Sequence, residues 1–288
     1  MTGAAGGSDA GYVEELVRAA IAEDLAGGVD VTTVATVPAD SLGIADFVVR
    51  GNGVLAGTAV AWAALHAVDP AVEVSVEIDD GTVVGPGDVV ITARGATRSL
   101  LTAERTALNL LCHLSGVATL TAAWVAAVDG TGVRIRDTRK TTPGLRVLEK
   151  YAVRCGGGVN HRSSLSEAAL IKDNHVLAAG GVGPAFAAVR AQWPDLSVEV
   201  EADTVEQVRQ ALAAGADLVL LDNMSLADLR ASVALARSAG ARTEASGGLT
   251  LARAREVAAT GVDFISVGAL THSAPVLDIA ADLRTESV

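Results

Sequence analysis

The segment 137–144, with the sequence Asp-Thr-Arg-Lys-Thr-Thr-Pro-Gly, places two cations side by side at Arg139 and Lys140. An arginine guanidinium binds a carboxylate through two parallel hydrogen bonds, whereas a lysine ammonium is a compact point charge. Pro143 and Gly144 stiffen the loop that carries them. The segment therefore favours recognition of a dicarboxylate or a phosphate, with a solvated basic loop as the alternative.

Charged residues also end three successive strand-like segments, at Lys172, Glu201 and Asp222. The parallel strands of a barrel all point the same way, so side chains at their carboxyl ends gather at one rim, where barrel enzymes hold their active sites. A single such residue would be an ordinary surface charge. Three in succession predict one active site to which all three contribute.

Two glycine-containing turns near the C-terminus follow strands and lead towards helical segments. They are Ser246-Gly247-Gly248 and Val267-Gly268-Ala269. Backbone amides and helix N-termini bind phosphate, and in barrels they do so preferentially after the last two strands. A lone glycine pair would indicate only a turn, but two such turns predict a phosphate site.

A third glycine run, 156–158, leads to His161 and Arg162. By itself the run indicates a flexible linker, but the two residues at its end add positive charge to the same half of the expected rim as Lys172. Cys155 precedes the run without an evident base beside it. We therefore expect a buried, inert thiol and not a nucleophile.

The elements that must position these residues begin with a helix and a small sheet. Apolar residues at helical spacing predict a helix over 12–23, and β-branched runs between glycine turns predict strands at 45–49, 72–78 and 88–93. The sheet is superficially similar to biotin or lipoyl carrier domains. Those domains need an acceptor lysine, and no lysine precedes Lys140. We interpret this sheet as structural.

A long, mostly apolar helix is predicted over 102–129, with the threonine at its start as N-cap. Glu104 falls in the first turn, where the helix dipole favours an acid. Arg105, Asn109 and His113 recur every fourth residue and form one polar stripe on this helix. The stripe either faces solvent or contacts a partner protein, since no residue of its own domain is an obvious partner for it.

Beyond residue 130, strands alternate with amphipathic helices. The predicted strands are 133–137, 168–172, 197–201, 218–222, 242–246 and 264–268, and clear helices are 205–214, 226–239 and 251–260. A β/α unit about every 20 to 25 residues implies a parallel sheet. Because several strands end in polar residues, we expect the sheet to close into a barrel.

Composition limits the partners and the location. The formal net charge of −12 disfavours nucleic acids and anionic membrane surfaces, which attract basic proteins. No run reaches the roughly 18 consecutive apolar residues that cross a bilayer. The first residues show no secretory signal, and two cysteines do not make a disulfide framework. We expect a soluble cytoplasmic protein with reduced cysteines.

Together these motifs resemble those of the quinolinate phosphoribosyltransferase family, the carboxylating nicotinate-nucleotide pyrophosphorylases. The resemblance spans nearly the whole chain without a departure at the motif positions. The matching segments are 23–24, 28–33, 104–105, 108–109, 115–119, 137–144, 156–158, 160–162, 171–175, 199–201, 221–224, 244–248 and 266–268.

The resemblance implies an α/β fold with two domains. An N-terminal α/β sandwich domain is expected over 1–116, and an incomplete α/β barrel of the seven-stranded type over 117–275, with the tail 276–288 packing on the N-terminal domain. The family resemblance also implies a homodimer, or a higher oligomer, with shared active sites. In it, one subunit's N-terminal domain covers the partner's barrel mouth.

The implied reaction transfers a phosphoribosyl group from phosphoribosyl pyrophosphate to quinolinate and releases pyrophosphate and carbon dioxide. The product is nicotinate mononucleotide, a precursor of NAD, and no organic cofactor is needed. Quinolinate carries two carboxylates, which accounts for a cationic site in an acidic protein. The resemblance assigns quinolinate binding to Arg105, Arg139, His161, Arg162 and Lys172.

The same resemblance assigns the phosphoribosyl donor to the rest of the site. Thr138 and Lys140 bind substrate, with Lys140 facing the pyrophosphate, and the two glycine turns bind the 5-phosphate. Glu201 and Asp222 bind the ribose hydroxyls and hold Mg²⁺ through the donor and water. Lys140, Glu201 and Asp222 are the predicted catalytic residues.

Three other functions stay open at this point. A related transferase-like protein associated with molybdenum transport resembles the same family. A lysine-dependent barrel lyase would use Lys140 or Lys172 as a Schiff base. A phosphate-ligand sensor would use the barrel without turnover. The cluster of cations suited to a dicarboxylate favours quinolinate.

Overall fold

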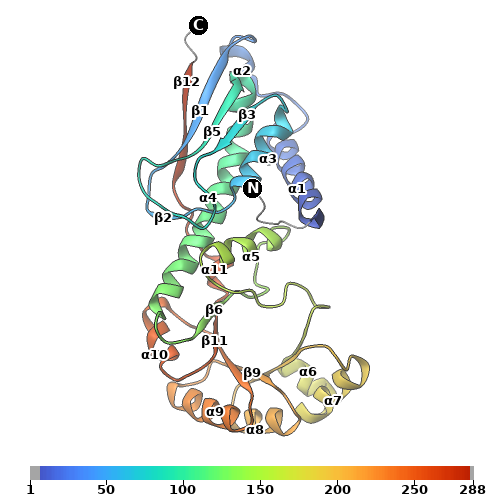
Figure 1. The fold of residues 1–288 in the computed structure, drawn as a ribbon. Coiled ribbons are helices and arrows are strands. Elements are labelled where there is room, and N and C mark those ends of the chain that lie inside the picture. The colour runs from blue at the N-terminus through green and yellow to red at the C-terminus, as the bar shows by residue number, and fades with distance from the viewer. Residues whose placement is uncertain (1–6, 286–288) are drawn as a thin grey trace. The chain divides into compact units, whose positions relative to one another are not determined.

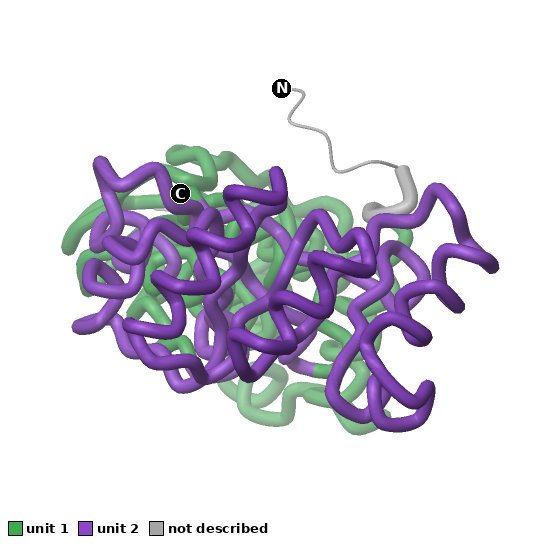
Figure 2. The backbone as a smooth tube through the Cα atoms, turned by 90° about the horizontal axis from the view of Figure 1, so that it is seen from below, with its two compact units in different colours: residues 1–120, 143–157, 274–288 green, residues 121–142, 158–273 purple. Residues whose placement is uncertain are grey.

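The computed structural model describes residues 7–285 (Figure 1). The chain forms two compact units, which Figure 2 colours separately. Unit 1 comprises Met1–Leu120, Pro143–Gly157 and Ala274–Val288, and unit 2 comprises Thr121–Thr142 and Gly158–Ser273. Each unit therefore combines segments that lie far apart in the sequence.

Unit 1 contains a four-stranded antiparallel sheet with the strand order β12-β1-β5-β3. These strands are β1 (Leu42–Val49), β3 (Glu73–Val76), β5 (Val89–Ala96) and β12 (Ile279–Thr285), and a separate ladder joins β2 (Gly53–Val54) to β4 (Val83–Val84). The C-terminal tail thus supplies an edge strand beside β1. Buried side chains such as Phe47 and Ile91 form the core beneath the sheet.

The helices of unit 1 are α1 (Gly7–Leu25), α2 (Val31–Thr36), α3 (Thr58–Val68), α5 (Arg146–Cys155) and most of α4 (Thr97–Ala127), whose residues 97–120 belong to this unit. α1 and α3 pack against each other. α2 begins where the carboxylate of Asp30 accepts a hydrogen bond from the Thr33 amide at 3.0 Å. This N-cap satisfies one of the free amides of the first helical turn.

The long helix α4 begins at Thr97, so the N-cap predicted at Thr102 is wrong by five residues. Strand β5 ends at Ala96 and the chain turns directly into the helix. The Thr97 amide donates to the Ser41 carbonyl and the two hydroxyls bond each other, both at 2.9 Å. A tertiary contact with another segment therefore starts the helix, and the local capping signal does not.

Helix α4 is long and apolar enough to span a membrane, and it alone meets that description among the residues that the structure describes. A core helix passes the same test. Side chains along one side of α4, among them Leu111 and Leu114, are fully buried, and the backbone at Gly116 packs against Pro275 so closely that no Cβ would fit. We therefore interpret α4 as a core helix of unit 1.

The segment Pro143–Gly157 belongs to unit 1, although the sequence placed it in the barrel domain. Three contacts explain this difference. His113 on α4 bonds Glu149 on α5 at 2.9 Å, the Tyr151 hydroxyl donates to Asp80 at 2.9 Å, and the Tyr12 hydroxyl donates to the Gly144 carbonyl. His113 therefore has a partner within its own unit, contrary to our expectation for the polar stripe.

Unit 2 is built on six parallel strands in the order β6-β11-β10-β9-β8-β7. They are β6 (Arg134–Arg136), β7 (Ala169–Ile171), β8 (Val198–Ala202), β9 (Leu218–Asp222), β10 (Arg242–Ser246) and β11 (Phe264–Ser266). Val159 forms a parallel bridge to Arg136 and adds a seventh position beside β6. The first strand of this unit, β6, thus pairs with the last, β11, as it does in an α/β barrel. The sheet begins at β7 and ends beside Val159 without a pairing between the two in the described residues, which confirms an incomplete barrel.

Helices follow the strands of unit 2, as predicted. They are α6 (Asp173–Ala179), α7 (Val182–Gln192), α8 (Val205–Ala213), α9 (Leu226–Ser238), the short 3₁₀ helix η1 (Leu251–Arg253), α10 (Ala254–Ala258) and α11 (Ala269–His272). Thr204 and Gln207 form a capping box at the start of α8, and Ser225 caps α9. These local signals fix where each strand gives way to its helix and so where the strand-end side chains lie.

Candidate active site

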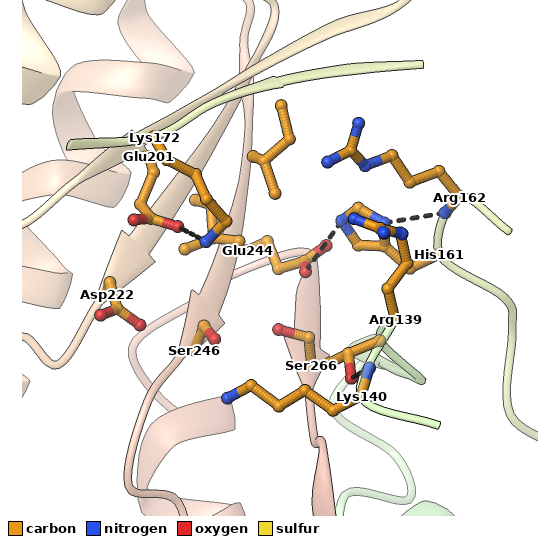
Figure 3. A pocket seen from close by; sticks show the side chains of 13 residues that line it. Arg139, Lys140, His161, Arg162, Lys172, Glu201, Asp222, Glu244, Ser246 and Ser266 are labelled. Atoms are coloured by element: carbon orange, nitrogen blue, oxygen red, sulfur yellow. Dashed lines mark hydrogen bonds and ion pairs between the residues drawn. The ribbon is translucent and has the colours of Figure 1, made fainter. Parts of the chain in front are cut away.

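Side chains at the carboxyl ends of the unit 2 strands line a pocket with a volume of about 360 Å³ (Figure 3). Nine lining residues are among the predicted site residues: Thr138, Arg139, Lys140, His161, Arg162, Lys172, Glu201, Asp222 and Ser246. Four others were not predicted: Leu170, Leu220, Glu244 and Ser266. The strand-end residues of the sequence thus meet at one rim.

A smaller pocket of about 210 Å³ shares four lining residues with the first, namely Thr138, Lys140, Ser246 and Ser266. The rest of its lining is Gly247, Gly248, Leu249, Val267, Gly268, Ala269 and His272. Both predicted glycine turns therefore lie on this pocket. A Cβ at Gly268 would come within 2.9 Å of Lys140 Cδ, so glycine here lets the lysine lie against the backbone.

The two sides of the larger pocket differ in charge. Arg139 and Arg162 lie on one side, and Figure 3 shows Glu201 and Asp222 on the other. Burial, and then the neighbouring Arg139 guanidinium, lower the pKa of Arg162, which stays a cation at neutral pH. The guanidinium groups of Arg139 and Arg162 repel each other, and an anion bound between them would offset this repulsion. This side is therefore suited to a carboxylate ligand.

Lys172, at the end of β7, pairs with Glu201 on β8 on the acidic side of the pocket. The lysine side chain is 47% exposed and the glutamate 11%. The Lys172 amide also donates to His175 Nδ1 at 2.9 Å, which fixes the backbone at the start of α6. The Lys172 ammonium is thus engaged by a carboxylate, whereas a Schiff-base lysine must present a free amine to a carbonyl substrate.

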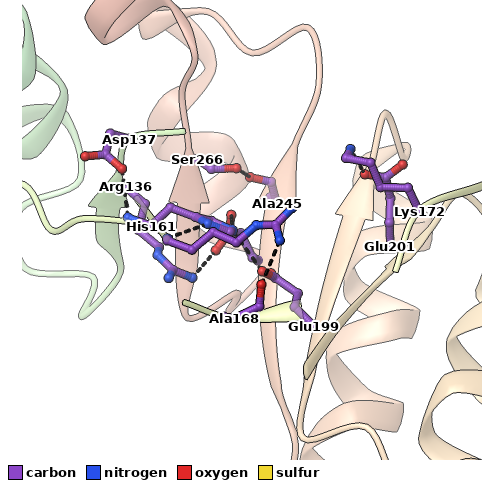
Figure 4. A network of polar contacts seen from close by, with 11 residues as sticks. Arg136, Asp137, His161, Ala168, Lys172, Glu199, Glu201, Ala245 and Ser266 are labelled. Atoms are coloured by element: carbon purple, nitrogen blue, oxygen red, sulfur yellow. Dashed lines mark hydrogen bonds and ion pairs between the residues drawn. The ribbon is translucent and has the colours of Figure 1, made fainter. Parts of the chain in front are cut away.

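His161 lines the pocket, but both of its ring nitrogens are engaged by the protein (Figure 4). Nε2 lies 2.8 Å from Glu199, and Nδ1 accepts the Arg162 amide at 2.8 Å. Asp137 accepts the His161 amide at 2.7 Å and the Asn160 side chain at 2.5 Å. The histidine therefore holds the loop that carries Arg162, and its predicted contact with quinolinate stays a prediction.

Behind His161 lies a buried pair of carboxylates, Glu199 on β8 and Glu244 on β10. Arg136 pairs with Glu244, and the Oε1 atom of each glutamate lacks a hydrogen-bond partner among the described residues. Burial, and then the neighbouring Glu199 carboxylate, raise the pKa of Glu244, with Arg136 opposing them. Glu244 thus retains its proton more readily than an ordinary glutamate does.

One cluster of three potential metal ligands lies in the described part of the chain, and two further carboxylates line the larger pocket. His161, Glu199 and Glu244 bring their ligand atoms within 4.8 Å of one another, but the arginine already bound to Glu244 disfavours a cation there. Glu201 and Asp222 face the open pocket with the oxygen ligands that Mg²⁺ prefers. Glu201 and Asp222 therefore fit the predicted magnesium.

Replacing Glu244 by alanine is expected to reduce the free energy of unfolding by roughly 3–5 kcal/mol, because the Arg136 guanidinium loses its buried partner. Urea denaturation measures this, and Glu256→Ala, on an exposed ion pair, is the matched control with a loss below about 0.5 kcal/mol. Equal losses would contradict a buried network.

The raised pKa of Glu244 adds a pH dependence to this stability. The folded state binds the proton more tightly than the unfolded chain, so this contribution is present below the unfolded pKa and is lost as pH rises through the folded pKa. Glu244→Gln, which cannot ionise, is expected to flatten this decline as pH rises above the usual pKa range of a glutamate. An unchanged pH profile would refute the assignment.

The sequence contained a signal for the buried acids that we did not use. Glu199 and Glu244 each lie two residues before a predicted site residue, Glu201 and Ser246, and alternate residues of a strand face the same side. His272, on the smaller pocket, had no such signal. His272 is the last residue of the short helix α11, so it does not directly follow the end of a strand.

Arg105 belongs to a different unit of the chain from these residues. All residues that line the two pockets belong to unit 2, whereas Arg105 is an exposed residue of α4 in unit 1. Its predicted role in the site stays a prediction.

Both cysteines are unpaired, as expected. Burial raises the pKa of the Cys155 thiol to about 11, with Asp80 adding to the effect. The thiolate is the nucleophilic form, so Cys155 is inert near neutral pH.

Comparisons with known proteins show the family of this chain. Residues 30–115 match the family model "Quinolinate phosphoribosyl transferase, N-terminal domain", and residues 117–282 match the corresponding C-terminal domain. The "Nicotinate-nucleotide pyrophosphorylase [carboxylating]" of Mycobacterium leprae is 50% identical over 93% of this chain and 96% of its own length.

More distant relatives give the same result. The "Quinolinate phosphoribosyltransferase [decarboxylating] 2b, mitochondrial" of Nicotiana tabacum is 38% identical over 95% of this chain and 83% of its own. The solved structure of NadC from Streptococcus pyogenes superimposes with a TM-score of 0.90 at 39% identity, covering 96% of this chain and 97% of that one.

Proposed function

The chain belongs to the quinolinate phosphoribosyltransferase family, and we propose that its two adjoining pockets hold the two substrates of the family's reaction. The protein transfers the phosphoribosyl group of phosphoribosyl pyrophosphate to quinolinate with loss of carbon dioxide, a step of de novo NAD biosynthesis. One observation carries the assignment of the pockets. Four cations, Arg139, Lys140, Arg162 and Lys172, surround one cavity in a protein of net charge −12.

Quinolinate occupies the side of the larger pocket that holds Arg139 and Arg162. Each guanidinium can bind a carboxylate through two hydrogen bonds, and the two carboxylates of quinolinate then separate the two repelling cations. His161 and Asp137 support this side by fixing the loop of Arg162. The ring is thereby oriented with its nitrogen towards the acidic side.

The phosphoribosyl donor spans the two pockets. Its 5-phosphate lies on the amides of the Gly247–Gly248 and Gly268–Ala269 turns, and its ribose hydroxyls meet Glu201 and Asp222. Lys140 lines both pockets, so its ammonium can follow the pyrophosphate as that group leaves. Thr138 lies beside it and lines both pockets as well.

The reaction begins when the bond between ribose C1 and pyrophosphate breaks and positive charge develops on C1. The fixed carboxylates of Glu201 and Asp222 stabilise that charge, and Lys140 stabilises the leaving anion. The quinolinate nitrogen then forms the bond to C1. Once alkylated, the ring nitrogen is cationic and stabilises the electron pair left on the adjacent carbon when carbon dioxide departs. That carbon finally takes a proton.

Magnesium fits the acidic side of the pocket, because Glu201 and Asp222 supply oxygen ligands. When bound, it neutralises charge on the pyrophosphate. Lys172 already pairs with Glu201, which favours contacts to the ion through water and the donor in place of a direct bond. The residues of this chain would hold and orient the donor around it.

The pocket argues against the other functions considered. A Schiff-base lyase needs a lysine amine free to attack a carbonyl, whereas Lys172 forms an ion pair with Glu201. A sensor would not require carboxylates opposite a cluster of cations. The transferase-like protein associated with molybdenum transport resembles the same family, so family membership does not distinguish it from this protein. Turnover of quinolinate distinguishes the two functions.

The protein works as a homodimer, or a higher oligomer, with shared sites, and it resides in the cytoplasm. Arg105 supports the shared site, because it is exposed on α4 and matches the family motif without lining its own chain's pockets. The two unpaired cysteines favour a reducing compartment.

Supplying quinolinate, phosphoribosyl pyrophosphate and Mg²⁺ is expected to yield nicotinate mononucleotide, pyrophosphate and carbon dioxide. Nicotinate, which lacks the second carboxylate, should react with a kcat/KM roughly 10- to 100-fold lower, because part of the cationic side stays unpaired. Product analysis with each acid measures both. Absence of product from quinolinate would refute the function, and equal turnover of the two acids would refute the dicarboxylate site.

A further inference from the structure

Asn223, directly after β9, has a backbone conformation that is rare for a residue with a side chain. Its φ of 53° lies in the left-handed region, which among the described non-glycine residues only Ala26 shares. Asparagine tolerates this region better than most residues, but the conformation still costs free energy. The surrounding contacts must therefore hold it in place.

Those contacts join the ends of two neighbouring strands. The Asn223 amide donates to the Ser246 carbonyl at 2.9 Å, and its side-chain Nδ2 donates to Asp222 Oδ2 at 2.6 Å. An ionised carboxylate only accepts hydrogen bonds, so the atom facing it is the NH₂ group of the carboxamide. One residue thus fixes the carboxylate that ends β9 and the carbonyl that ends β10.

The same carboxamide packs against the first glycine turn. A Cβ built on Gly247 would lie 2.4 Å from Asn223 Oδ1 and 2.5 Å from its Cγ, so no other residue fits there while Asn223 keeps this position. Gly247 itself has a φ of 87°. A Cβ built on Gly248 would lie 3.5 Å from Asn223 Oδ1, an ordinary van der Waals distance. The shape of the turn and the position of the side chain therefore depend on each other.

We propose that Asn223 is a positioning residue that holds the Asp222 carboxylate and the Gly247–Gly248 turn in one geometry, so that the donor's ribose hydroxyls and its 5-phosphate are recognised together. This inference rests on the proposed function, which assigns those two places to the donor. Quinolinate binds at the arginine side of the pocket, to which Asn223 makes no contact that the structure shows. The effect of Asn223 is therefore specific to the donor.

The test compares three variants. Asn223→Gly keeps access to the left-handed backbone but removes the carboxamide, and Asn223→Asp keeps the shape but places a second negative charge beside Asp222. Asn52→Gly is the matched control, because Asn52 also lies beside a glycine, where a Cβ built on Gly85 would be 3.3 Å from Asn52 Oδ1, but it belongs to unit 1 and lines neither pocket. Each is measured for Tm, for KM and kcat with phosphoribosyl pyrophosphate, and for quinolinate Kd by calorimetry.

We expect Asn223→Gly to raise the donor KM or lower kcat so that kcat/KM for the donor falls roughly 10-fold, the effect of losing a hydrogen bond to a charged group. Asn223→Asp should be worse because of the added charge. The quinolinate Kd should change less than about 2-fold for both, and Asn52→Gly should match wild type.

Two outcomes would overturn the proposal. One is a donor kcat/KM for folded Asn223→Gly and Asn223→Asp equal to that of wild type, and the other is an equal loss of quinolinate affinity, which would indicate general distortion. If Asn223→Gly has a low Tm, Asn223→Asp decides. Failure of the proposed function itself is distinguished by the wild-type protein, which would then form no nicotinate mononucleotide at all.

Discussion

Substituting Arg105 by alanine is expected to abolish quinolinate turnover without unfolding the protein, and mixing this variant with Lys172→Ala is expected to restore about a quarter of wild-type activity. Arg105 is exposed on α4, where a substitution changes stability by about 0.5 kcal/mol or less. In the shared-site hypothesis it completes the partner's quinolinate pocket. Activity and Tm of the single variants, and activity of the mixture, are measured.

The quarter follows from the symmetry of a dimer. Random exchange makes half of the dimers heterodimers, and each has one site with both defects and one site with neither, so about one site in four is intact. Arg139→Ala mixed with Lys172→Ala is the control. Both residues lie in unit 2, so each site of that heterodimer keeps one defect and no activity should return. No recovery by the Arg105 mixture, despite demonstrated heterodimers, would place Arg105 in its own subunit's site.

Arg139→Ala and Arg162→Ala are expected to weaken quinolinate binding at least about 30-fold, the effect of removing one member of a buried charge pair. Donor binding should change much less, because the glycine turns and the two acids that hold it are untouched. Calorimetry with quinolinate, and separately with phosphoribosyl pyrophosphate and Mg²⁺, measures the two effects.

Lys140→Ala is the matched variant for this pair, because Lys140 adjoins Arg139 in sequence but also lines the smaller pocket. It should weaken donor binding more than quinolinate binding. If the arginine variants lose both ligands equally, the division of the pocket into a quinolinate side and a donor side is wrong. Tm values confirm that each variant is folded.

Much of the fold was predictable because local patterns and topology agree. The alternation of strands and helices after residue 130 predicted the parallel strands of unit 2, and the strand from 218 to 222 was predicted to the residue. Parallel strands must end at the same edge, so Lys172, Glu201 and Asp222 had to meet once the strands were known. Motif resemblance gave the family, which the comparisons confirm.

The sequence by itself determined which residues gather at the barrel rim, because strand direction and side-chain alternation are local properties. Tertiary structure alone decided the rest: that α4 starts at Thr97, that Pro143–Gly157 joins unit 1, and that His161 turns towards Glu199. Each of these depends on a partner far away in the chain, such as Ser41 for Thr97. Local spacing carries no information about such a partner until the chain has folded.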